Sequence, residues 1–336
     1  MNKTLIFNTR INRHEEGKTV LSLLSERFTY LDQLEWSENI AAGKVRLNGD
    51  AVSCTWKVSI GDNLTYHPDS LDEPEVSTDA EVIDSSPDFL LTGKPAGIPV
   101  SRTGRIVCNT FINILRDRFN NPDIHLMHRL DRETSGLLLC AKSKEVCRKH
   151  QKNLARIMTG KYYLAIVQGR IEVNGLRIEF PLGKDPNSEI RCQVTVAPNG
   201  KPSSTIIYTV AATNEKSMLL ARLVTGRRHQ LRCHLSHLGH PIIGDKIYNH
   251  GGKFYLKRLT QELTDQDFLE LQTRNHTLHA WAADITLPGQ EPRLYHSHSF
   301  PAEFIHQATA FPGWRNPAAK ILEQARNPKI THIHCP

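Results

Sequence analysis

The sequence predicts two folded parts: an α/β (α+β) domain with a mixed, largely antiparallel sheet flanked by helices, and a small αβ domain before it. The length of 336 residues exceeds one average domain. An acidic segment divides the chain, and after it apolar runs with strand spacing alternate with runs of helical spacing. We therefore expect, in chain order, a small domain at 1–68, a linker at 69–88, a main domain at 89–298 and a C-terminal extension at 299–336.

The small N-terminal domain is expected to hold two helices and a hairpin. Apolar residues at helical spacing predict a helix over 19–28, and a second helix is expected over 31–42, ending at the glycine that follows. An alternating strand at 44–47 leads into Asn48-Gly49, a dipeptide typical of hairpin turns. A further turn and strand are expected within 58–66.

The main domain begins with a change of pattern at Phe89. An uninterrupted apolar run at 136–141 predicts a strand that is buried on both faces. Strands that alternate with helices at hairpin-like spacings predict the mixed sheet. The expected elements are, in order, a strand from Phe89 into a Gly/Pro turn, a strand at 136–141, a helix at 144–158, strands at 162–168 and 218–224, and a helix ending near Gly239.

Charge is distributed unevenly along the chain. Residues 1–68 hold 8 basic and 8 acidic residues, and residues 69–88 hold 8 acidic residues and no basic one. Residues 89–336 hold 34 basic and 19 acidic residues, a balance of +15. A basic body suits a polyanionic partner, of which nucleic acid is the commonest, although basic surfaces are also often simply solvated.

The sequence predicts a soluble cytoplasmic protein with no membrane partner, and we expect a monomer. No apolar run approaches the roughly 20 residues of a membrane helix, and the first 18 residues lack the apolar core of a secretory signal. The seven cysteines are scattered, odd in number and never spaced Cys-x-x-Cys. This usage favours reduced thiols over a disulfide framework.

Asp131 is the first residue that suggests chemistry. It lies among His128, Arg129 and Arg132, just before the expected buried strand. Neighbouring cations keep a carboxylate ionised, which suits a nucleophile or a base, and a site at a strand end is accessible. The alternative is a salt-bridged turn in which nearby hydroxyl groups satisfy the backbone. The local pattern by itself allows both interpretations.

A second cluster lies on the last expected helix of the main domain. Arg228 and Arg232 are four residues apart near its start, where an anion is favoured, so an arginine there can reach Asp131 or an RNA phosphate. The spacing of His229, Cys233 and His237 also allows a zinc site, although no Cys-x-x-Cys supports it. An ordinary basic amphipathic helix is the third interpretation.

Two further positions have both a structural and a functional interpretation. Tyr163, near the start of an expected strand, is either sheet packing or a base-stacking and proton-handling group beside a flipped nucleotide. Lys94 starts a plain Lys-Pro-Ala-Gly turn. The sequence has no Walker loop, no Gly-x-Gly-x-x-Gly and no Ser/His/Asp ordering, so nucleotide-driven and hydrolase chemistry lack support.

Five motifs follow one another along the main domain. They are Lys-Pro-Ala-Gly at 94–97, His-Arg-Leu-Asp-Arg-Glu-Thr-Ser-Gly-Leu at 128–137, Lys-x-Tyr-Leu-Ala at 161–165, Thr-Gly-Arg-x-His-Gln-Leu-Arg at 225–232 and Gly-His-Pro-Ile-Ile-Gly-Asp-x-x-Tyr at 239–248. Taken in this order, they resemble the RluA family of pseudouridine synthases over about residues 89–290. In the small domain, Gly-x-Val-x-x-Asn-Gly and Gly-Asp make residues 17–67 resemble the RNA-binding domain named after ribosomal protein S-four.

The resemblance implies that Asp131 is a catalytic aspartate, that Arg232 pairs with it and that Tyr163 lies over the target ring. Arg129 would fill the space that a flipped nucleotide leaves. The enzyme would isomerise uridine in structured RNA without a cofactor or metal. The expected substrate-binding residues are Arg129, His128, Lys94, Arg227, His229 and Gln230.

The RNA target stays open at this point. Members of the family act on large-subunit ribosomal RNA or on transfer RNA, and the N-terminal module favours ribosomal RNA. A catalytically inactive RNA-binding or ribosome-assembly protein is the remaining alternative, although the intact aspartate, tyrosine and arginine favour an enzyme. Attack by Asp131 on C6 of the ring and attack on C1′ of the sugar are both compatible with the motifs.

Overall fold

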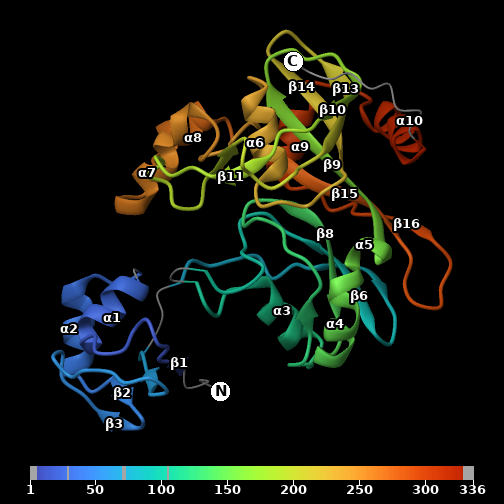
Figure 1. Cartoon of the computed structure of the whole chain (residues 1–336). Helices are drawn as coiled ribbons and strands as arrows, with labels where there is room; N and C mark the ends of the chain where they lie inside the picture. The colour runs from blue at the N-terminus through green and yellow to red at the C-terminus, as the bar shows by residue number, and fades with distance from the viewer. Residues whose placement is uncertain (1–5, 29, 70–72, 104–105, 328–336) are drawn as a thin grey trace. The chain divides into compact units, whose positions relative to one another are not determined.

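The computed structural model describes residues 6–28, 30–69, 73–103 and 106–327 (Figure 1). The chain divides into two compact units. The first consists of Met1–Glu75 with Ser101–Thr110, and the second consists of Val76–Val100 with Phe111–Pro336. No helix in the described part of the chain is both long enough and apolar enough to cross a membrane.

Two short helices of the first unit begin at side-chain caps. Helix α1 (Val20–Arg27) follows Thr19, whose hydroxyl accepts a hydrogen bond from a backbone N–H of the first turn. Helix α2 (Gln33–Ala41) starts at a reciprocal capping box between Asp32 and Glu35. These caps account for the starting points of both helices, and the helices expected in this region are confirmed.

Four strands complete the first unit, in the sheet order β1-β4-β2-β3. The expected hairpin turn lies between β2 and β3, where Asn48 and Gly49 both have positive φ. Trp36 is fully buried in the core between this sheet and the helices. The strands are β1 (Phe7–Arg10), β2 (Val45–Leu47), β3 (Asp50–Ala51) and β4 (Asn63–Tyr66).

A ten-stranded mixed sheet forms the centre of the second unit, in the order β10-β13-β14-β9-β15-β8-β6-β5, with β16 beside β15 and β7 beside β8. Among the described strands of this sheet, only β8 and β15 pair in parallel, so the predicted mixed, largely antiparallel sheet is confirmed. Its strands are β5 (Glu81–Ser85), β6 (Phe89–Lys94), β7 (His125–Leu126), β8 (Ser135–Ala141), β9 (Met158–Gln168), β10 (Asn174–Ile178), β13 (Thr205–Ala212), β14 (Lys216–Leu223), β15 (Leu278–Ile285) and β16 (Arg293–His296). A separate two-stranded sheet pairs β11 (Leu182–Lys184) with β12 (Val194–Val196).

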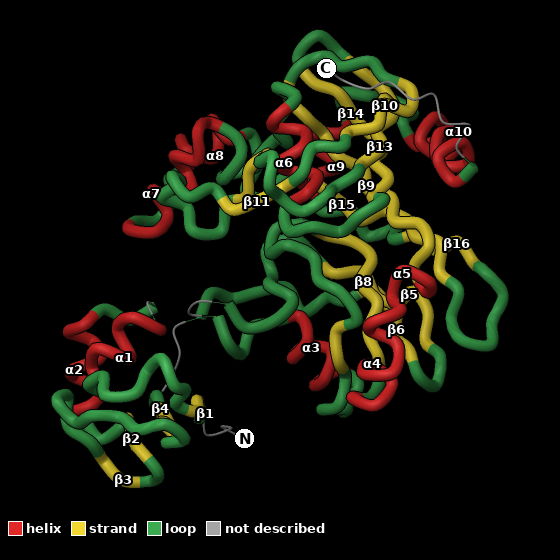
Figure 2. The backbone as a smooth tube through the Cα atoms, viewed as in Figure 1, coloured by secondary structure: helices red, strands yellow, loops and turns green. Residues whose placement is uncertain are grey.

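Helices flank this sheet (Figure 2). The helix expected at 144–158 is broken into α4, a 3-10 turn and α5 before the chain enters β9. The helical segments of the second unit are α3 (Phe111–Arg118), α4 (Lys144–His150), η1 (Gln151–Asn153), α5 (Leu154–Ile157), α6 (Gln230–His237), η2 (His250–Gly252), α7 (Lys253–Thr260), α8 (Asp265–Leu271), α9 (Ala302–Ala308) and α10 (Arg315–Arg326).

Strand β9 separates two apolar cores. Because side chains alternate between the faces of a strand, neighbouring residues of β9 enter different clusters. Tyr163 and Ala165 pack in the cluster to which α6 contributes. Tyr162 and Leu164 pack in the cluster to which α9 and α10 contribute. The sheet therefore has one face that carries Tyr163 and an opposite face covered by the C-terminal helices.

The segment expected as a linker differs from the structure. Strand β5 lies within it and pairs antiparallel with β6. Its acidic side chains accept hydrogen bonds from the other end of the domain: Glu81 from the Ser297 hydroxyl at 2.9 Å and Asp84 from the Tyr295 hydroxyl at 2.6 Å. Over 81–85, the acidic side chains that indicated a linker therefore take part in tertiary packing. Residues 70–72 lie outside the described part of the chain.

Two other expected boundaries also differ. Helices α9 and α10 lie in the extension expected at 299–336, yet Phe304 and Leu322 are buried in the core of the main sheet. Residues 328–336 of that extension are not among those described. Residues 101–110 group with the first unit because the Glu73 carboxylate accepts hydrogen bonds from successive backbone N–H groups there.

Gly136 is required where β8 pairs in parallel with β15. It has a φ of +103°, and a Cβ built on it would lie 2.2 Å from the backbone oxygen of Ala280. Only glycine lets the two backbones approach this closely without a clash. The loop that carries Asp131 leads directly into this strand, so the contact helps to fix the loop.

Gly136→Ala should destabilise the second unit by about 3 kcal/mol or more, because backbone strain at positive φ adds to a clash with backbone atoms. Urea unfolding would measure the change. Gly289→Ala is the matched control, since Gly289 has a φ of +75° with no atom within 4 Å of a built Cβ. The control should lose only about 1–2 kcal/mol, and equal losses would contradict the assigned role of the close approach.

Candidate active site

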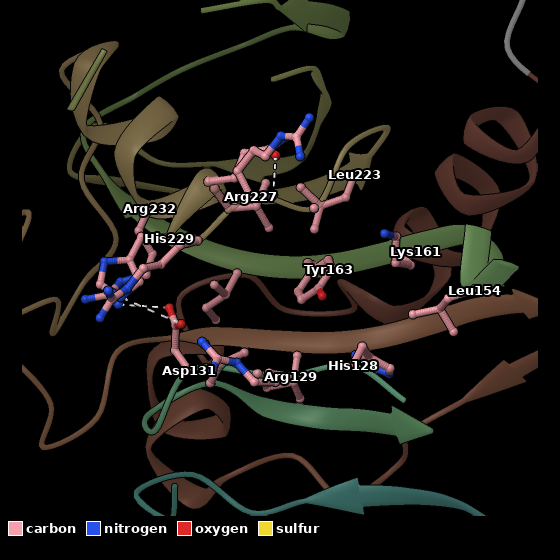
Figure 3. A pocket seen from close by; sticks show the side chains of 17 residues that line it. His128, Arg129, Asp131, Leu154, Lys161, Tyr163, Leu223, Arg227, His229 and Arg232 are labelled. Carbon is pink, nitrogen blue, oxygen red and sulfur yellow. Dashed lines mark hydrogen bonds and ion pairs between the residues drawn. The ribbon is translucent and has the colours of Figure 1, made fainter. Parts of the chain in front are cut away.

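A pocket of about 350 Å³ opens beside β9, the loop before β8 and the start of α6 (Figure 3). This volume lies within the range of small-ligand sites. The pocket brings together eight of the nine residues predicted to form the site. They are His128, Arg129, Asp131, Tyr163, Arg227, His229, Gln230 and Arg232.

Asp131 and Arg232 form an ion pair across the pocket. Arg232 Nη1 donates to Asp131 Oδ2 at 2.9 Å, although the two residues are 101 positions apart in the chain. The Asp131 side chain is 28% exposed, whereas that of Arg232 is 6% exposed. The carboxylate therefore faces the pocket, while the guanidinium lies behind it.

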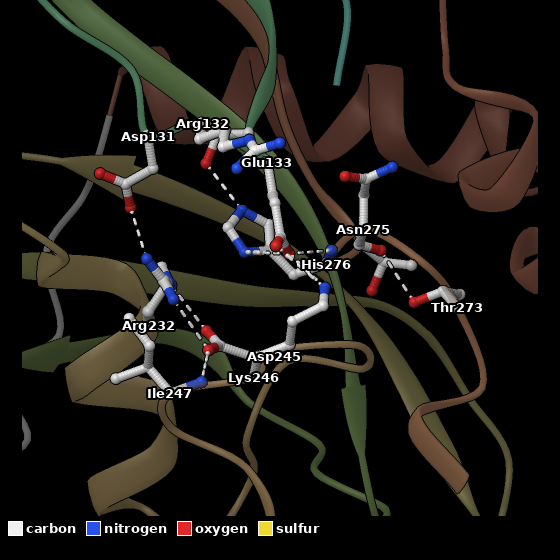
Figure 4. A network of polar contacts seen from close by, with 12 residues as sticks. Asp131, Arg132, Glu133, Arg232, Asp245, Lys246, Ile247, Thr273, Asn275 and His276 are labelled. Atoms are coloured by element: carbon white, nitrogen blue, oxygen red, sulfur yellow. Dashed lines mark hydrogen bonds and ion pairs between the residues drawn. The ribbon is translucent and has the colours of Figure 1, made fainter. Parts of the chain in front are cut away.

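Asp245 fixes the position of that guanidinium. Arg232 donates to it from Nε at 2.6 Å and from Nη2 at 2.8 Å, a bidentate pair (Figure 4). Asp245 is fully buried and also accepts the backbone N–H groups of Ile247 and Tyr248. With its Nε and Nη2 both held by Asp245, the guanidinium directs its remaining Nη1 at Asp131.

Asp131 is ionised at neutral pH. Burial alone would raise the pKa of its carboxyl, but the charge of Arg232, the nearby imidazoles and the Arg232 hydrogen bond together hold the pKa below its usual value. His229 Nε2 lies 3.7 Å from Asp131 Oδ1. Burial lowers the pKa of His229 to about 4, so this imidazole is neutral at pH 7.

The turn before α6 is held by Gln230. Its side-chain oxygen accepts from the Arg227 N–H at 2.9 Å and from the Thr225 hydroxyl at 2.8 Å, and its amide donates to the Ser204 carbonyl. Gln230 is only 2% exposed. The expected substrate-binding residue therefore shapes the turn that presents Arg227, whose side chain is exposed at the pocket.

Tyr163 lines the middle of the pocket from β9 (Figure 3). Burial, with a smaller contribution from Asp131, raises the pKa of its hydroxyl, so the phenol stays protonated at neutral pH. Arg129 is exposed on the pocket side of the Asp131 loop. The neighbouring His128 accepts the Leu139 N–H on its Nε2 at 3.1 Å, and burial lowers its pKa to about 4.

Lys94 differs from the expectation that it binds substrate. It is 1% exposed and is not among the residues that line the pocket. Its Nζ donates to the carbonyl oxygens of Pro95, Ile98 and Arg132, at 2.7, 2.9 and 3.0 Å. Burial lowers its pKa to about 7. Lys94 thus connects the Lys-Pro-Ala-Gly turn to the Asp131 loop through these buried hydrogen bonds.

A second buried charge cluster surrounds Glu133. Lys246 Nζ lies 2.9 Å from each carboxylate oxygen, Arg258 Nη1 donates at 3.1 Å, and the backbone N–H of His276 donates at 3.2 Å (Figure 4). Burial would raise the pKa of Glu133, but the surrounding positive charges, Lys246 foremost, lower it to about 2. The adjacent Thr134 hydroxyl contacts His276 Nε2 at 2.8 Å.

The residues described in the structure contain no group of three or more His, Cys, Asp or Glu side chains that could hold a metal ion. In the cluster proposed for zinc, His229 Nδ1 instead contacts the Tyr248 hydroxyl at 3.1 Å. The spacing of His229, Cys233 and His237 along one helix therefore does not bring a ligand set together. The six cysteines in the described part of the chain are all free thiols.

Comparison with known proteins identifies the family. A family model described as RNA pseudouridylate synthase matches residues 88–237. Over 237 residues the chain is 30% identical to an uncharacterized RNA pseudouridine synthase of Synechocystis, covering 69% of this chain and 80% of that protein. The chain belongs to the RNA pseudouridine synthase family. It is therefore an isomerase that modifies RNA.

Two further similarities bear on this RNA pseudouridine synthase. It is 28% identical over 274 residues to ribosomal large subunit pseudouridine synthase D of Vibrio parahaemolyticus, covering 79% of this chain and 83% of that one. The structure of human RNA pseudouridylate synthase domain containing 1 shares its fold, with a TM-score of 0.51 at 24% identity over 71% of this chain and 98% of that one. The matched family region begins at residue 88, so the likeness of 17–67 to the S-four domain stays a prediction.

Three residues of the synthase were missed as parts of the site: Asp245, Glu133 and His276. Asp245 and Glu133 stand inside the quoted motifs, which was the available signal. The sequence could not reveal their partners, because Asp245 meets Arg232, and Glu133 meets Lys246, only in the folded chain. His276 carried no signal of its own.

Glu133→Gln should cost the synthase about 3 kcal/mol of unfolding free energy at pH 7, because the folded-state pKa of about 2 lies below the ordinary value of 4.5. A lowered carboxyl pKa stabilises the fold fully above pH 4.5, and this stability is lost as pH falls from 4.5 toward 2. Urea unfolding should therefore show a difference in unfolding free energy between wild type and variant that falls to about half or less of its pH 7 value near pH 3. The control is Glu323→Gln at an exposed position on α10, which should not change the unfolding free energy. If the free-energy difference caused by Glu133→Gln did not depend on pH, the ionic explanation would be refuted.

Proposed function

We propose that this RNA pseudouridine synthase uses Asp131 as the nucleophile that isomerises a uridine in large-subunit ribosomal RNA. The observation that carries the proposal is the 2.9 Å ion pair between Asp131 and Arg232 in the pocket that Tyr163 also lines. An ionised, partly exposed carboxylate held by a buried arginine is prepared for attack on carbon. The same arginine neutralises negative charge that returns to Asp131 when the enzyme is released.

Access to the uridine requires base flipping. A stacked uridine cannot place its ring carbon at Asp131, so the nucleotide must leave the helix at a cost of a few kcal/mol. Contacts between the exposed Arg227 and Arg228 and RNA phosphates can offset that cost. In this proposal the Arg129 side chain takes the place of the extruded base, and the Tyr163 ring packs against that base inside the pocket.

The reaction rearranges bonds without a net change in composition. Asp131 forms a bond with C6 of the ring or with C1′ of the ribose, and the bond between N1 and C1′ breaks. The uracil turns in the pocket, and C5 forms a bond with C1′. The bond between Asp131 and C6 or C1′ breaks, which regenerates the carboxylate, while C5 releases its proton and N1 gains one. Neither an oxidant nor a hydrolytic water enters this balance.

Ribosomal RNA is the substrate we favour among the family's RNAs. The Vibrio relative, which is matched over most of its length, is named for the large ribosomal subunit. Residues 89–336 are strongly basic, with 34 basic and 19 acidic residues, which suits binding to a large folded RNA. We further propose that the helix–helix–hairpin unit at the N-terminus contributes to RNA binding.

Asp131→Asn should abolish pseudouridine formation while RNA binding survives, because the amide keeps the shape of the carboxylate but is not a nucleophile. Product is measured on cellular RNA, and binding is measured by filter retention of the same RNA. Asp88→Asn, at an exposed carboxylate before β6, is the control and should keep full activity. Pseudouridine made by Asp131→Asn would rule out the assignment of the nucleophile.

Deletion of the gene should remove pseudouridine from one or more positions of large-subunit ribosomal RNA, and expression of the intact chain should restore it. Chemical mapping of pseudouridine across all cellular RNAs is the measurement, with the Asp131→Asn chain as the negative control. A loss confined to transfer RNA would show that the choice of substrate is wrong while leaving the reaction intact.

A further inference from the structure

We propose that an exposed basic surface on α4, η1 and α5 binds the RNA backbone next to the flipped uridine. We call this surface the basic track and define it by five exposed residues: Lys144, Arg148, Lys149, Lys152 and Arg156. The inference rests on the proposed function, since it names the side of the pocket along which the substrate strand continues.

The track is an unbalanced concentration of positive charge. Residues 142–161 contain seven lysines and arginines and a single acidic residue, Glu145. Within the described part of the chain, no ion pair and no hydrogen bond uses the side chain of any of the five track residues; the one carboxylate contact is made by the Lys144 backbone, whose N–H donates to Asp123 Oδ2 at 2.9 Å. Their charges are thus available to a partner.

The α7–α8 pair shows that such charges are balanced elsewhere in the same unit. Residues 253–274 contain four basic and four acidic residues. All four cations there are paired: Lys253 with Glu270, Lys257 with Asp267, Arg258 with Glu133 and Arg274 with Asp265. The track lacks this neutralisation, so its charge is directed outward.

The track is continuous with the pocket. Leu154 of α5 and Lys161 of β9 line the pocket at the end away from Asp131 and Arg232 (Figure 3). Lys152 and Arg156 are exposed two residues on either side of Leu154. A strand whose flipped nucleotide reaches Asp131 can therefore leave the pocket past Lys161 and meet these cations next.

Packing holds the track rigidly against the domain. Cys147 and Ile157 are buried in the same core as Tyr163, and Val146 and Leu154 pack against that core. The apolar side of the segment is thus fixed while its basic side faces solvent. At about 1.5 Å per helical residue, α4 alone extends over roughly 10 Å, and η1 and α5 lengthen the surface further, so it can contact more than one phosphate of a strand.

RNA fits this surface better than an acidic protein does. Protein interfaces generally have an apolar core surrounded by polar residues. None of the large hydrophobic side chains that are exposed in the described part of the chain lies between 142 and 161. Lysine and arginine without exposed apolar neighbours are typical of phosphate contacts.

The test compares two double variants that each remove one lysine and one arginine. Lys152→Gln with Arg156→Gln changes the track, and Arg315→Gln with Lys320→Gln changes α10, which covers the opposite face of the sheet. Glutamine keeps helix propensity close to that of lysine and arginine, so both proteins should stay folded, as circular dichroism can verify. The probe is an unmodified transcript of large-subunit ribosomal RNA, with affinity measured from 0.05 to 0.3 M salt.

The track variant should bind the transcript about 20-fold more weakly near 0.15 M salt, and the slope of log affinity against log salt should fall by roughly 1.4–1.8, the value for two lost phosphate contacts. The α10 variant should stay within about twofold of wild type with an unchanged slope. Equal effects of the two double variants, or an unchanged slope for the track variant, would overturn the proposal; the second result is also what a contact with an acidic protein predicts.

A second measurement needs no substitution. In the intact chain, bound transcript should protect Lys149 and Lys152 from acetylation, as read by mass spectrometry, while Lys320 stays reactive. Equal reactivity of all three lysines with and without RNA would count against the track. Both measurements report RNA binding, so their outcome does not depend on which residue is the nucleophile. An active enzyme whose track is not protected by RNA would refute only this inference. Pseudouridine formation by Asp131→Asn would refute the proposed function.

Discussion

The candidate active site depends on one buried arginine held between two carboxylates. Asp245, which is fully buried, holds Nε and Nη2 of Arg232, and the remaining Nη1 donates to Asp131. Removing such charges from water is costly unless every partner is well placed. The pair with Asp245 meets that condition, so the cation that keeps Asp131 ionised is fixed before any RNA binds. The turn held by Gln230 and the loop held by Lys94 extend the same restraint to both sides of the pocket.

The pocket lies on one face of the main sheet, and helices α9 and α10 cover the opposite face. Along β9, Tyr163 points to the face on which the pocket lies, and Tyr162 points to the face covered by α9 and α10. The Tyr162 hydroxyl donates to Asp284 at 2.8 Å, which anchors that second face. Two adjacent tyrosines therefore have separate tasks because side chains alternate in a strand.

The lysines and arginines of the second unit fall into two groups, one paired with carboxylates and one not. Around Glu133 and on α7–α8, cations are paired with carboxylates and stabilise the fold. Apart from Arg232, the lysine and arginine side chains that the structure describes at the pocket and on the basic track have no carboxylate partner. This contrast is more informative than the net charge of +7, because a paired lysine has little charge to offer an RNA while an unpaired one releases counterions when a phosphate binds.

Local pattern in the sequence determined the helices of the first unit, its hairpin turn and the buried strand at 136–141, because caps, turn dipeptides and apolar runs act over a few residues. Ordered motifs also marked nine candidate site residues, of which eight line the pocket. Features that depend on contacts between distant residues were decided only by the tertiary structure. These are the burial of Lys94 and the hold of Asp245 on Arg232. They also include the pairing of β5 with β6 and the packing of α9 and α10 in the core of the main sheet. Composition reports a residue's charge, but burial and partners far along the chain determine whether that charge faces the pocket, holds the Asp131 carboxylate or stabilises the fold.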